Sequence, residues 1–325
     1  MIPHLRSSAL VALFVATFAA LTACSSQSAR QATGWVPSSP ITVAMITHQT
    51  PGDAFWDLVR KGAQDAAAKN NVTLRYYSDP SAAQQAELVQ NAIDQRVDGI
   101  ALTLAKPNAM ADVVRKARAN NIPVVAFNSG MDNWKSIGAM EYFGSDEAIA
   151  GTEFGERLNS IGAKHALCVI QEQGQVALET RCSSLKKAFR GQTDMLYVNG
   201  QNPPDVQASI TSKLQQDPSI DQVVTLGAPF AMIALQSVNS AGSHAKVATF
   251  DTNKQAVQAI QQGKLEWAVD QQPYLQGYLA VEALALFKNN GDTFGGNAQA
   301  VLTGPSFVDQ SNVAQIATFA ARGTR

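Results

Sequence analysis

The sequence predicts an α/β protein in which parallel β-sheets carry helices on both faces. From Ile41 onward, short apolar runs alternate with segments that repeat apolar residues at helical spacing, almost to the end of the chain. Several runs are continuously apolar, as expected for strands buried on both faces. The 325 residues, 46% hydrophobic and 16% charged, give room for one large core or two smaller ones.

Each apolar run is a predicted strand, and each amphipathic segment between runs is a predicted helix. We expect strands at 41–47, 72–77, 98–104, 122–128, 165–170, 222–228, 245–251 and 265–271. We expect helices at 57–71, 83–97, 108–121, 146–162, 178–191, 203–217, 230–242 and 253–264. Open parallel sheets bind ligands beyond the carboxyl ends of their strands. The binding site is therefore expected at the strand-to-helix turns, which carry most of the chain's unusual polar and aromatic residues.

The N-terminal segment has the features of a secretory signal. His4 and Arg6 precede "ALVALFVATFAAL", a run that is apolar except for Thr17 and too short for a membrane span. The following "LTAC" resembles a bacterial lipobox, which predicts a signal peptide at 1–23 and lipidation of Cys24. The alternative is ordinary cleavage beside an incidental cysteine. Residues 24–40, rich in small and polar side chains, would then form a flexible tether to the membrane.

The two remaining cysteines are expected to form a disulfide, because the signal places them outside the cytoplasm. Cys168 lies in the apolar run "HALCVI" and Cys182 in the helical segment "ETRCSSLKKAF". A bond between them would tie a strand to the next helix and stabilise the fold by roughly 3 kcal/mol. The alternative is two separate buried thiols.

Composition and motifs argue against nucleic-acid binding, metal binding and catalysis. The chain carries 25 Lys plus Arg against 26 Asp plus Glu, without a block of like charge. Its four histidines are far apart, and no pair has metal-ligand spacing. No dinucleotide, phosphate-loop or Gly-x-Ser-x-Gly pattern occurs. We therefore expect a binding protein with no cofactor, no metal and no enzymatic activity.

Four stretches together resemble a known family. They are "ITVAMIT" with "GDAFWDLVRKGAQDAA", "QRVDGIALTLAKPNAMADVVRKARANNIPVVAFNSG", "FGSDEAIAGTEFGERL", and "VATFDTNKQAVQAIQQGKLEWAVDQQPYLQGYLAVEAL". The chain resembles the bacterial periplasmic sugar-binding proteins of the ribose-binding type, the solute receptors of ABC importers, from Ile41 to near its end. The resemblance implies two similar doubly wound parallel-sheet lobes, joined by a three-strand hinge around a ligand cleft. The lobes would comprise 41–144 with 273–302, and 145–272 with 303–325.

The resemblance also implies roles for the residues around the first helix. Phe55 and Trp56 match two aromatics that stack on a sugar ring, and Asp53 matches a polar residue that accepts hydroxyl hydrogen bonds. A flat ring beside a carboxylate suits a polyol, which has both C–H faces and hydroxyls. The alternative for the aromatic pair is packing in the core. Which of the two rings stacks on the ligand stays open.

Three further matches lie at later turns. Arg181 matches an arginine that reaches ligand hydroxyls, with a surface salt bridge as the alternative. Asp251 matches an aspartate that binds hydroxyl pairs; it could also cap the helix that "DTNK" opens. Gln271 matches the glutamine before the third crossing, and "QQP" favours it over Gln272, with hinge packing as the alternative.

Two departures from ribose receptors affect the expected specificity. Asn128 and Ser129 replace an Asp-Arg pair, and Ala228-Pro229 replaces an asparagine site. The loss of both charges indicates a different hydroxyl pattern, although Asn128 can donate and accept toward a neutral ligand. Asn128 and Ser129 stay candidate ligand contacts, and His48, Glu172 and Met140 are weaker ones.

The expected function is that of an extracytoplasmic, lipid-anchored monomer. It would capture a small neutral sugar or sugar alcohol by hinge closure and deliver it to an ABC permease. One alternative is a receptor for a sugar-like signal, such as an autoinducer or a sensor-kinase input. A LacI-type repressor core and an α/β enzyme fit less well, because of the lipobox and the missing catalytic motifs.

Overall fold

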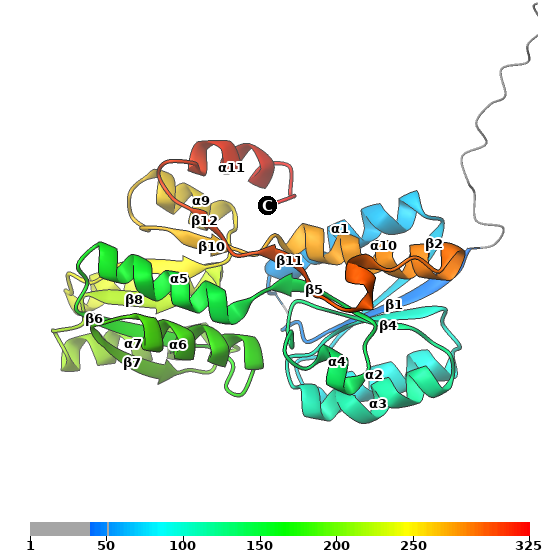
Figure 1. Cartoon of the computed structure of the whole chain (residues 1–325). Helices are drawn as coiled ribbons and strands as arrows, with labels where there is room; N and C mark the ends of the chain where they lie inside the picture. The colour runs from blue at the N-terminus through cyan, green and yellow to red at the C-terminus, as the bar shows by residue number, and fades with distance from the viewer. Residues whose placement is uncertain (1–39, 51) are drawn as a thin grey trace, which may run out of the picture. The chain divides into compact units, whose positions relative to one another are not determined.

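The computed structural model describes residues 40–50 and 52–325. The predicted signal peptide, Cys24 and all but the last residue of the tether lie outside the described residues. Within the described part, no helix combines the length and the apolar character that a membrane crossing requires. The described chain contains two six-stranded sheets, each at the centre of its own lobe (Figure 1).

The first sheet has the strand order β11-β5-β4-β3-β1-β2, and all its pairings are parallel. Every residue of β3 and β4 is buried, which explains their unbroken apolar sequences. The strands are β1 (Ile41–Thr47), β2 (Val72–Ser78), β3 (Gly99–Thr103), β4 (Val124–Phe127), β5 (Glu141–Ser145) and β11 (Val301–Gly304).

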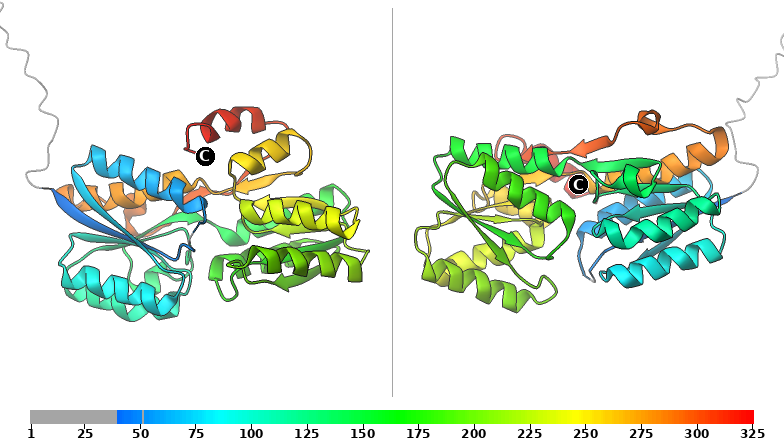
Figure 2. Two further views of the ribbon diagram at one scale, coloured as in Figure 1. Left: turned by 180° about the vertical axis from the view of Figure 1, so that it is seen from behind. Right: turned by 60° about the horizontal axis from the view of Figure 1, so that its bottom comes forward.

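Helices cover both faces of this sheet (Figures 1 and 2). One face packs against α2 (Ala82–Asp94), α3 (Pro107–Ala119) and α4 (Trp134–Ile137). The other face packs against α1 (Phe55–Lys69) and α10 (Pro273–Asn290), with the 3-10 helix η1 (Phe294–Asn297) beside it.

Two glycines allow α1 and α10 to pack closely. A Cβ on Gly62 would lie 1.9 Å from the carbonyl oxygen of Tyr274, and a Cβ on Gly277 would lie 2.0 Å from that of Val59. Each glycine thus faces the backbone of the other helix, where no side chain has room. This contact holds α10, which follows the second lobe in sequence, against the first helix of the first lobe.

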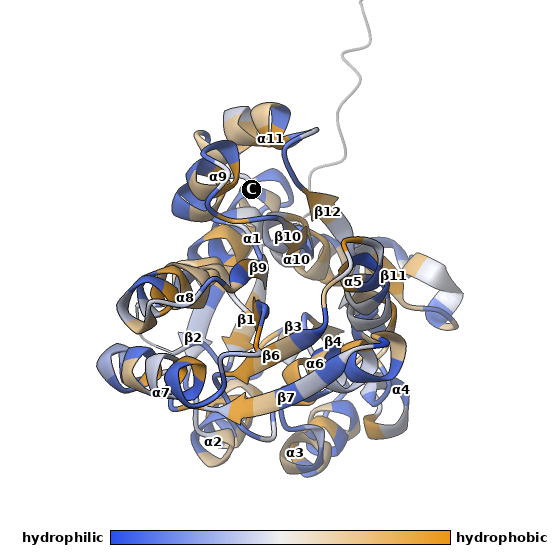
Figure 3. Cartoon of the chain, turned by 90° about the vertical axis from the view of Figure 1, so that its left-hand side faces the viewer, coloured by the Kyte–Doolittle hydropathy of each residue, from blue (hydrophilic) through white to orange (hydrophobic). Residues whose placement is uncertain are grey.

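The second sheet has the order β12-β10-β9-β8-β6-β7 and is parallel except for the pair β10 with β12. Its apolar residues concentrate in the strands, whereas the helices alternate between polar and apolar faces (Figure 3). The strands are β6 (His165–Ile170), β7 (Gln192–Tyr197), β8 (Gln222–Thr225), β9 (Lys246–Phe250), β10 (Ala268–Asp270) and β12 (Ser306–Val308).

The second sheet is likewise covered on both faces. Helices α5 (Glu147–Ser160) and α6 (Val176–Ala188) pack on one face. The other face carries α7 (Pro203–Gln216), α8 (Ala228–Ala241), α9 (Lys254–Gln261) and α11 (Val313–Ala320). The predicted fold class, two lobes built on parallel sheets, is therefore confirmed.

The chain passes between the two sheets three times: from β5 to α5, from β10 to α10, and from β11 to β12. Side chains join the second and third passages, where Thr303 Oγ1 donates to the carbonyl oxygen of Gln271 at 2.7 Å. These passages form the hinge between the lobes. The residue boundaries that the sequence indicates for the lobes stay a prediction.

Every predicted run contains a strand, and every predicted amphipathic segment contains a helix. Strands β5, β7, β11 and β12 were not predicted, because they are short or lack a continuous apolar run. Strand β7, for example, is an edge strand with the mixed sequence "QTDMLY". Helices α4, α10 and α11 were also not predicted; the buried residues of α10, for example, do not follow a single stripe.

The predicted disulfide is present between Cys168 in β6 and Cys182 in α6. Both residues are completely buried, and their Cα atoms are 6.0 Å apart. The bond ties an interior strand of the second sheet to the helix that carries Arg181, one of the predicted ligand contacts.

Removing this bridge is expected to lower the free energy of unfolding. For Cys168→Ala/Cys182→Ala we expect a loss of roughly 3 kcal/mol, because the unfolded chain regains the freedom of the closed loop. Urea unfolding followed by circular dichroism measures the change. As a control, a reductant added to the unfolding series should destabilise the wild type and leave the variant unaffected. A loss below about 1 kcal/mol would contradict the expectation.

Candidate functional site

A cleft of about 710 Å³ lies at the carboxyl ends of the strands of both lobes. Its volume falls within the roughly 300–1,000 Å³ of small-molecule sites. From the first lobe it is lined by His48, Thr50, Gly52, Asp53, Phe55, Trp56, Pro80, Lys106 and Asn128. The second lobe and the hinge contribute residues between 171 and 181, 197 and 203, 226 and 233, and 251 and 253, together with Gln271.

All predicted ligand contacts except Ser129 line this cleft. The side chain of Ser129 is fully buried, and its hydroxyl donates to Asn128 Oδ1 at 2.9 Å. Ser129 is therefore placed to orient Asn128 from behind. The structure brings the other predicted residues together from positions up to 218 residues apart in sequence, counted from Asp53 to Gln271.

The aromatic pair lies at the start of α1. Asp53 Oδ1 accepts a hydrogen bond from the backbone N–H of Phe55 at 3.1 Å, which fixes the turn into the helix. The rings of Phe55 and Trp56 meet edge to face, with centroids 5.2 Å apart. Trp56 is only 4% exposed and belongs to the core of the first lobe, whereas Phe55 is partly exposed. Core packing thus describes Trp56 well, and Phe55 presents more of its ring to the cleft.

A chain of amide and carboxylate groups runs from the first lobe through the hinge to the second lobe. Asn128 Nδ2 donates to Gln271 Oε1 at 3.2 Å, and Gln271 Nε2 donates to Asp251 Oδ1 at 2.7 Å. Gln276, on α10, holds Gln271 from behind through a bond of 2.9 Å to Oε1. The predicted alternative for Asp251 is wrong, because Asn253 caps α9 by accepting from Ala256 N.

Three residues of this region have left-handed backbone conformations. The φ angles of Asn128, Asp251 and Gln272 are 66°, 64° and 57°, and each residue directly follows a strand or lies in a hinge passage. Asn and Asp tolerate this region better than most residues, and Gln does not. Such conformations cost of order 1–3 kcal/mol each and cluster at functional sites.

Arg181 is not in a surface salt bridge. It is buried and forms a bidentate pair with Glu147, with Nε to Oε2 at 2.6 Å and Nη2 to Oε1 at 3.0 Å. Its Nη1 donates to the carbonyl oxygen of Leu226 and lies 4.0 Å from Asp251 Oδ2. The guanidinium also covers the ring of Phe250, 4.7 Å from its centroid. Sequence reasoning missed Glu147, which is 34 positions away and carries no motif.

Burial changes the protonation of several groups in the cleft. It raises the pKa of Asp251 to about 7, although the charge of Arg181 and the hydrogen bond from Gln271 act in the other direction. Burial also raises the pKa of Asp53, against the backbone bond from Phe55. The pKa of His48 falls to about 3, because of burial and the nearby charge of Lys106. His48 is therefore neutral at physiological pH.

His48 and Gln175 form a contact between the lobes. His48 Nδ1 lies 2.8 Å from Thr103 Oγ1, and Gln175 Nε2 lies 3.4 Å from His48 Nε2 and 3.3 Å from Ser129 Oγ. The side chain of Gln175 also caps α6 by accepting from Leu178 N at 2.9 Å. Nothing in the sequence distinguished Gln175 from its neighbours in "QEQGQ".

Two of the three weaker candidate ligand contacts line the cleft, and the third does not. His48 and Glu172 line the cleft, and Glu172 lies 3.9 Å from Lys106 of the other lobe. Met140 is not among the lining residues and packs against the core of the first lobe.

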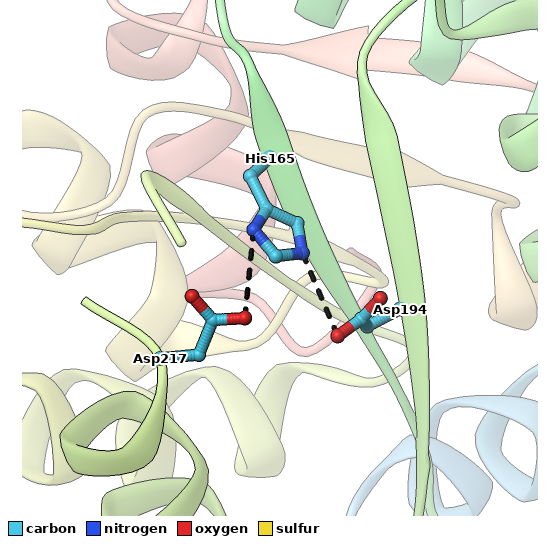
Figure 4. Close-up of side chains that lie close together, drawn as sticks. All are labelled: His165, Asp194 and Asp217. Atoms are coloured by element: carbon cyan, nitrogen blue, oxygen red, sulfur yellow. Dashed lines mark ion pairs between the residues drawn. The ribbon is translucent and has the colours of Figure 1, made fainter. Parts of the chain in front are cut away.

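A second cluster of titratable residues lies outside the cleft, at His165, Asp194 and Asp217 (Figure 4). The imidazole lies between the carboxylates, with Nε2 3.5 Å from Asp194 and Nδ1 3.8 Å from Asp217. Lys213 Nζ is 2.7 Å from Asp194 and 3.9 Å from Asp217, so a cation of the protein already offsets part of their negative charge. Since the two carboxylates face different ring nitrogens, we assign the cluster a structural role.

Comparison with known proteins shows which sequences and structures this chain is similar to. Residues 43–291 match the family described as periplasmic binding protein domain. A carbohydrate transporter from Acidothermus cellulolyticus 11B, solved in complex with myo-inositol, is 56% identical with a TM-score of 0.87. The match covers 88% of this chain and 100% of that one.

Two further relatives are more distant. The xylose/arabinose-binding protein of Sulfolobus acidocaldarius is 24% identical over 301 residues, which are 86% of this chain and 74% of that protein. The ribose import binding protein of Bacillus subtilis is 24% identical over 250 residues, 73% of this chain and 79% of that protein.

The two aromatics should respond differently to truncation. Trp56→Ala is expected to lower the free energy of unfolding by about 3–5 kcal/mol, because it leaves a cavity in the core. Phe55→Ala should cost only about 1 kcal/mol, because its ring is partly exposed. Chemical unfolding of both variants beside the wild type measures the difference. Equal losses would show that the two rings share one structural role.

Proposed function

From the premise that the chain belongs to the periplasmic binding protein domain family, we propose that it binds myo-inositol or a cyclitol of closely similar hydroxyl pattern. As a sugar-binding protein of the ABC transporter type, it is a binding protein and not an enzyme. The observation that carries the proposal is the 56% identity to the Acidothermus cellulolyticus transporter, whose structure holds myo-inositol.

The chemistry of the cleft supports a ligand of this kind. A cyclitol has hydroxyls around its rim and C–H groups on its faces. The carboxylates of Asp53 and Asp251 and the amides of Asn128 and Gln271 offer acceptors and donors to the rim. The partly exposed ring of Phe55 offers a surface to a C–H face.

The charges favour a neutral ligand over an anionic one. The two cations among the lining residues already face carboxylates: Arg181 pairs with Glu147, and Lys106 lies near Glu172. An anion would have to separate one of these pairs. Separating the buried pair would leave Glu147 without a partner, which is strongly unfavourable.

In the proposed cycle, the ligand closes the hinge because it bonds to both lobes. Contacts between the lobes then add to the contacts that the ligand makes. One example is the hydrogen bond from Val176 N to the carbonyl oxygen of Ala105, at 3.1 Å. The closed form would be recognised by an ABC permease. We further propose that residues 1–23 are a signal peptide, that Cys24 carries a lipid, and that the tethered protein is a monomer outside the cytoplasm.

Binding of myo-inositol is the direct test. Titration calorimetry on the chain lacking residues 1–24 should show one site, and saturating ligand should raise the melting temperature. Asp251→Asn should weaken binding by about 10- to 100-fold, the effect of losing hydrogen bonds to a charged acceptor. Ribose and arabinose serve as comparison ligands. If they bind while myo-inositol does not, the cyclitol proposal is wrong but sugar binding stands.

The affinity should depend on pH through Asp251. Ligand hydroxyls favour its ionised form, so we expect affinity to fall by up to about tenfold per pH unit below pH 7. In the protein without ligand, the raised pKa of Asp251 affects stability, and this effect has the opposite pH dependence to the effect on affinity. The folded state then holds more protons than the unfolded chain between about pH 4 and 7, so stability from this group falls as pH rises.

Calorimetry from pH 5.5 to 8.5, in buffers of different ionisation enthalpy, measures both the affinity and the proton released on binding. Asp251→Asn is the control and should show a flat profile. A wild-type affinity that does not change with pH would assign the hydroxyl contacts to other residues.

A further inference from the structure

One buried carboxylate in the hinge is not used by the proposed binding mechanism. Asp270 is the last residue of β10, and it is completely buried. The only cation that the structure places beside it, within the described residues, is Arg325, five residues beyond the end of α11. Arg325 Nε and Asp270 Oδ2 lie 3.0 Å apart, and neither atom has a hydrogen bond. The charge of Arg325 therefore offsets part of the cost of burying this carboxylate.

The other oxygen of Asp270 shapes the hinge backbone. Asp270 Oδ1 accepts the N–H of Gln272 at 3.0 Å, and this bond closes a turn in which Gln272 has its left-handed conformation. Gln272 Nε2 then donates to the carbonyl oxygen of Thr303 at 2.7 Å. Asp270 thus supports the link between the second and third passages of the chain.

The residue held inside this turn belongs to the cleft. Gln271 lies between Asp270 and Gln272, and its amide joins Asn128 of the first lobe to Asp251 of the second. Asp270 also acts on Asp251 directly, because its negative charge favours the protonated form of that carboxyl group. Any change in the charge or position of Asp270 therefore reaches two predicted ligand contacts.

We infer that Arg325 is a positioning residue for the ligand site, acting through Asp270; this inference rests on the proposed function. Without the guanidinium, the buried carboxylate has no counter-charge. It must either take up a proton or move toward solvent. Protonation makes Asp270 a weaker acceptor for the N–H of Gln272, and movement breaks that bond. Both responses loosen the turn that holds Gln271, and so weaken the ligand site, although Arg325 does not line it.

The test measures myo-inositol affinity by calorimetry in Arg325→Gln, Arg325→Lys and Asp270→Asn, and in the Asp270→Asn/Arg325→Gln pair. Arg322→Gln is the matched control, because it removes an arginine from the same segment that lies over Phe319 and not at the hinge. We expect Arg325→Gln to weaken binding by about tenfold or more, and Arg325→Lys to restore most of the loss. Arg322→Gln should bind like the wild type.

The double variant separates positioning from general destabilisation. In the Asp270→Asn background, Arg325→Gln should change affinity by less than about twofold, because no buried carboxylate is left to neutralise. An unchanged affinity in Arg325→Gln, or an equal loss in both backgrounds, would overturn the inference. If Arg325→Gln alone does not fold, the other two variants provide the test. Arg325→Lys should then bind nearly as well as the wild type, and the double variant should bind within about twofold of Asp270→Asn.

Failure of the wild type to bind myo-inositol counts against the proposed function instead. The variants are then compared with the sugar or polyol that raises the wild-type melting temperature.

Discussion

The side of the cleft that the second lobe provides depends on the buried ion pair between Arg181 and Glu147. Its burial is unfavourable for each ion alone, and the bidentate geometry compensates for much of the lost hydration. The carboxylates of Glu147 and Asp251 raise the pKa of Arg181 above its usual range despite burial. Because Glu147 begins α5 and Arg181 lies in α6, the pair fixes both helices beside the turn of Asp251. The disulfide at Cys182 anchors the same helix to the sheet.

Hydrogen bonds within the protein hold the polar residues of the cleft in place. Two residues with left-handed backbone conformations directly follow strands, and a third lies in a hinge turn. Each is held by hydrogen bonds with neighbouring residues. Preorganisation of this kind reduces the entropy that binding must remove. It also explains why polar groups as dissimilar as Asn128, Gln271 and Asp251 can lie within bonding distance in a buried place.

The sequence predicted the parts of this architecture that depend on local pattern. Alternating apolar and amphipathic segments located the central strands and most helices, and the resemblance to sugar receptors pointed to Asn128, Arg181 and Asp251. The side chains that contact these residues could not be predicted in this way. Glu147 begins a helix and resembles any charged first-turn residue, and only the packing of α5 against α6 brings it to Arg181. Likewise, Ser129 stands next to Asn128 in the sequence, but it does not line the cleft, and its hydroxyl contacts Asn128 and Gln175 instead.

The paired glycines between α1 and α10 have a consequence for the order in which the lobes can form. The first lobe needs α10 and β11, which are made only after nearly the whole second lobe, and the second lobe needs β12 and α11 from the very end. Such non-local contacts slow folding. Neither lobe can be completed on a chain that is still being synthesised far from its end. Until those late segments are made, the core of each lobe stays incomplete.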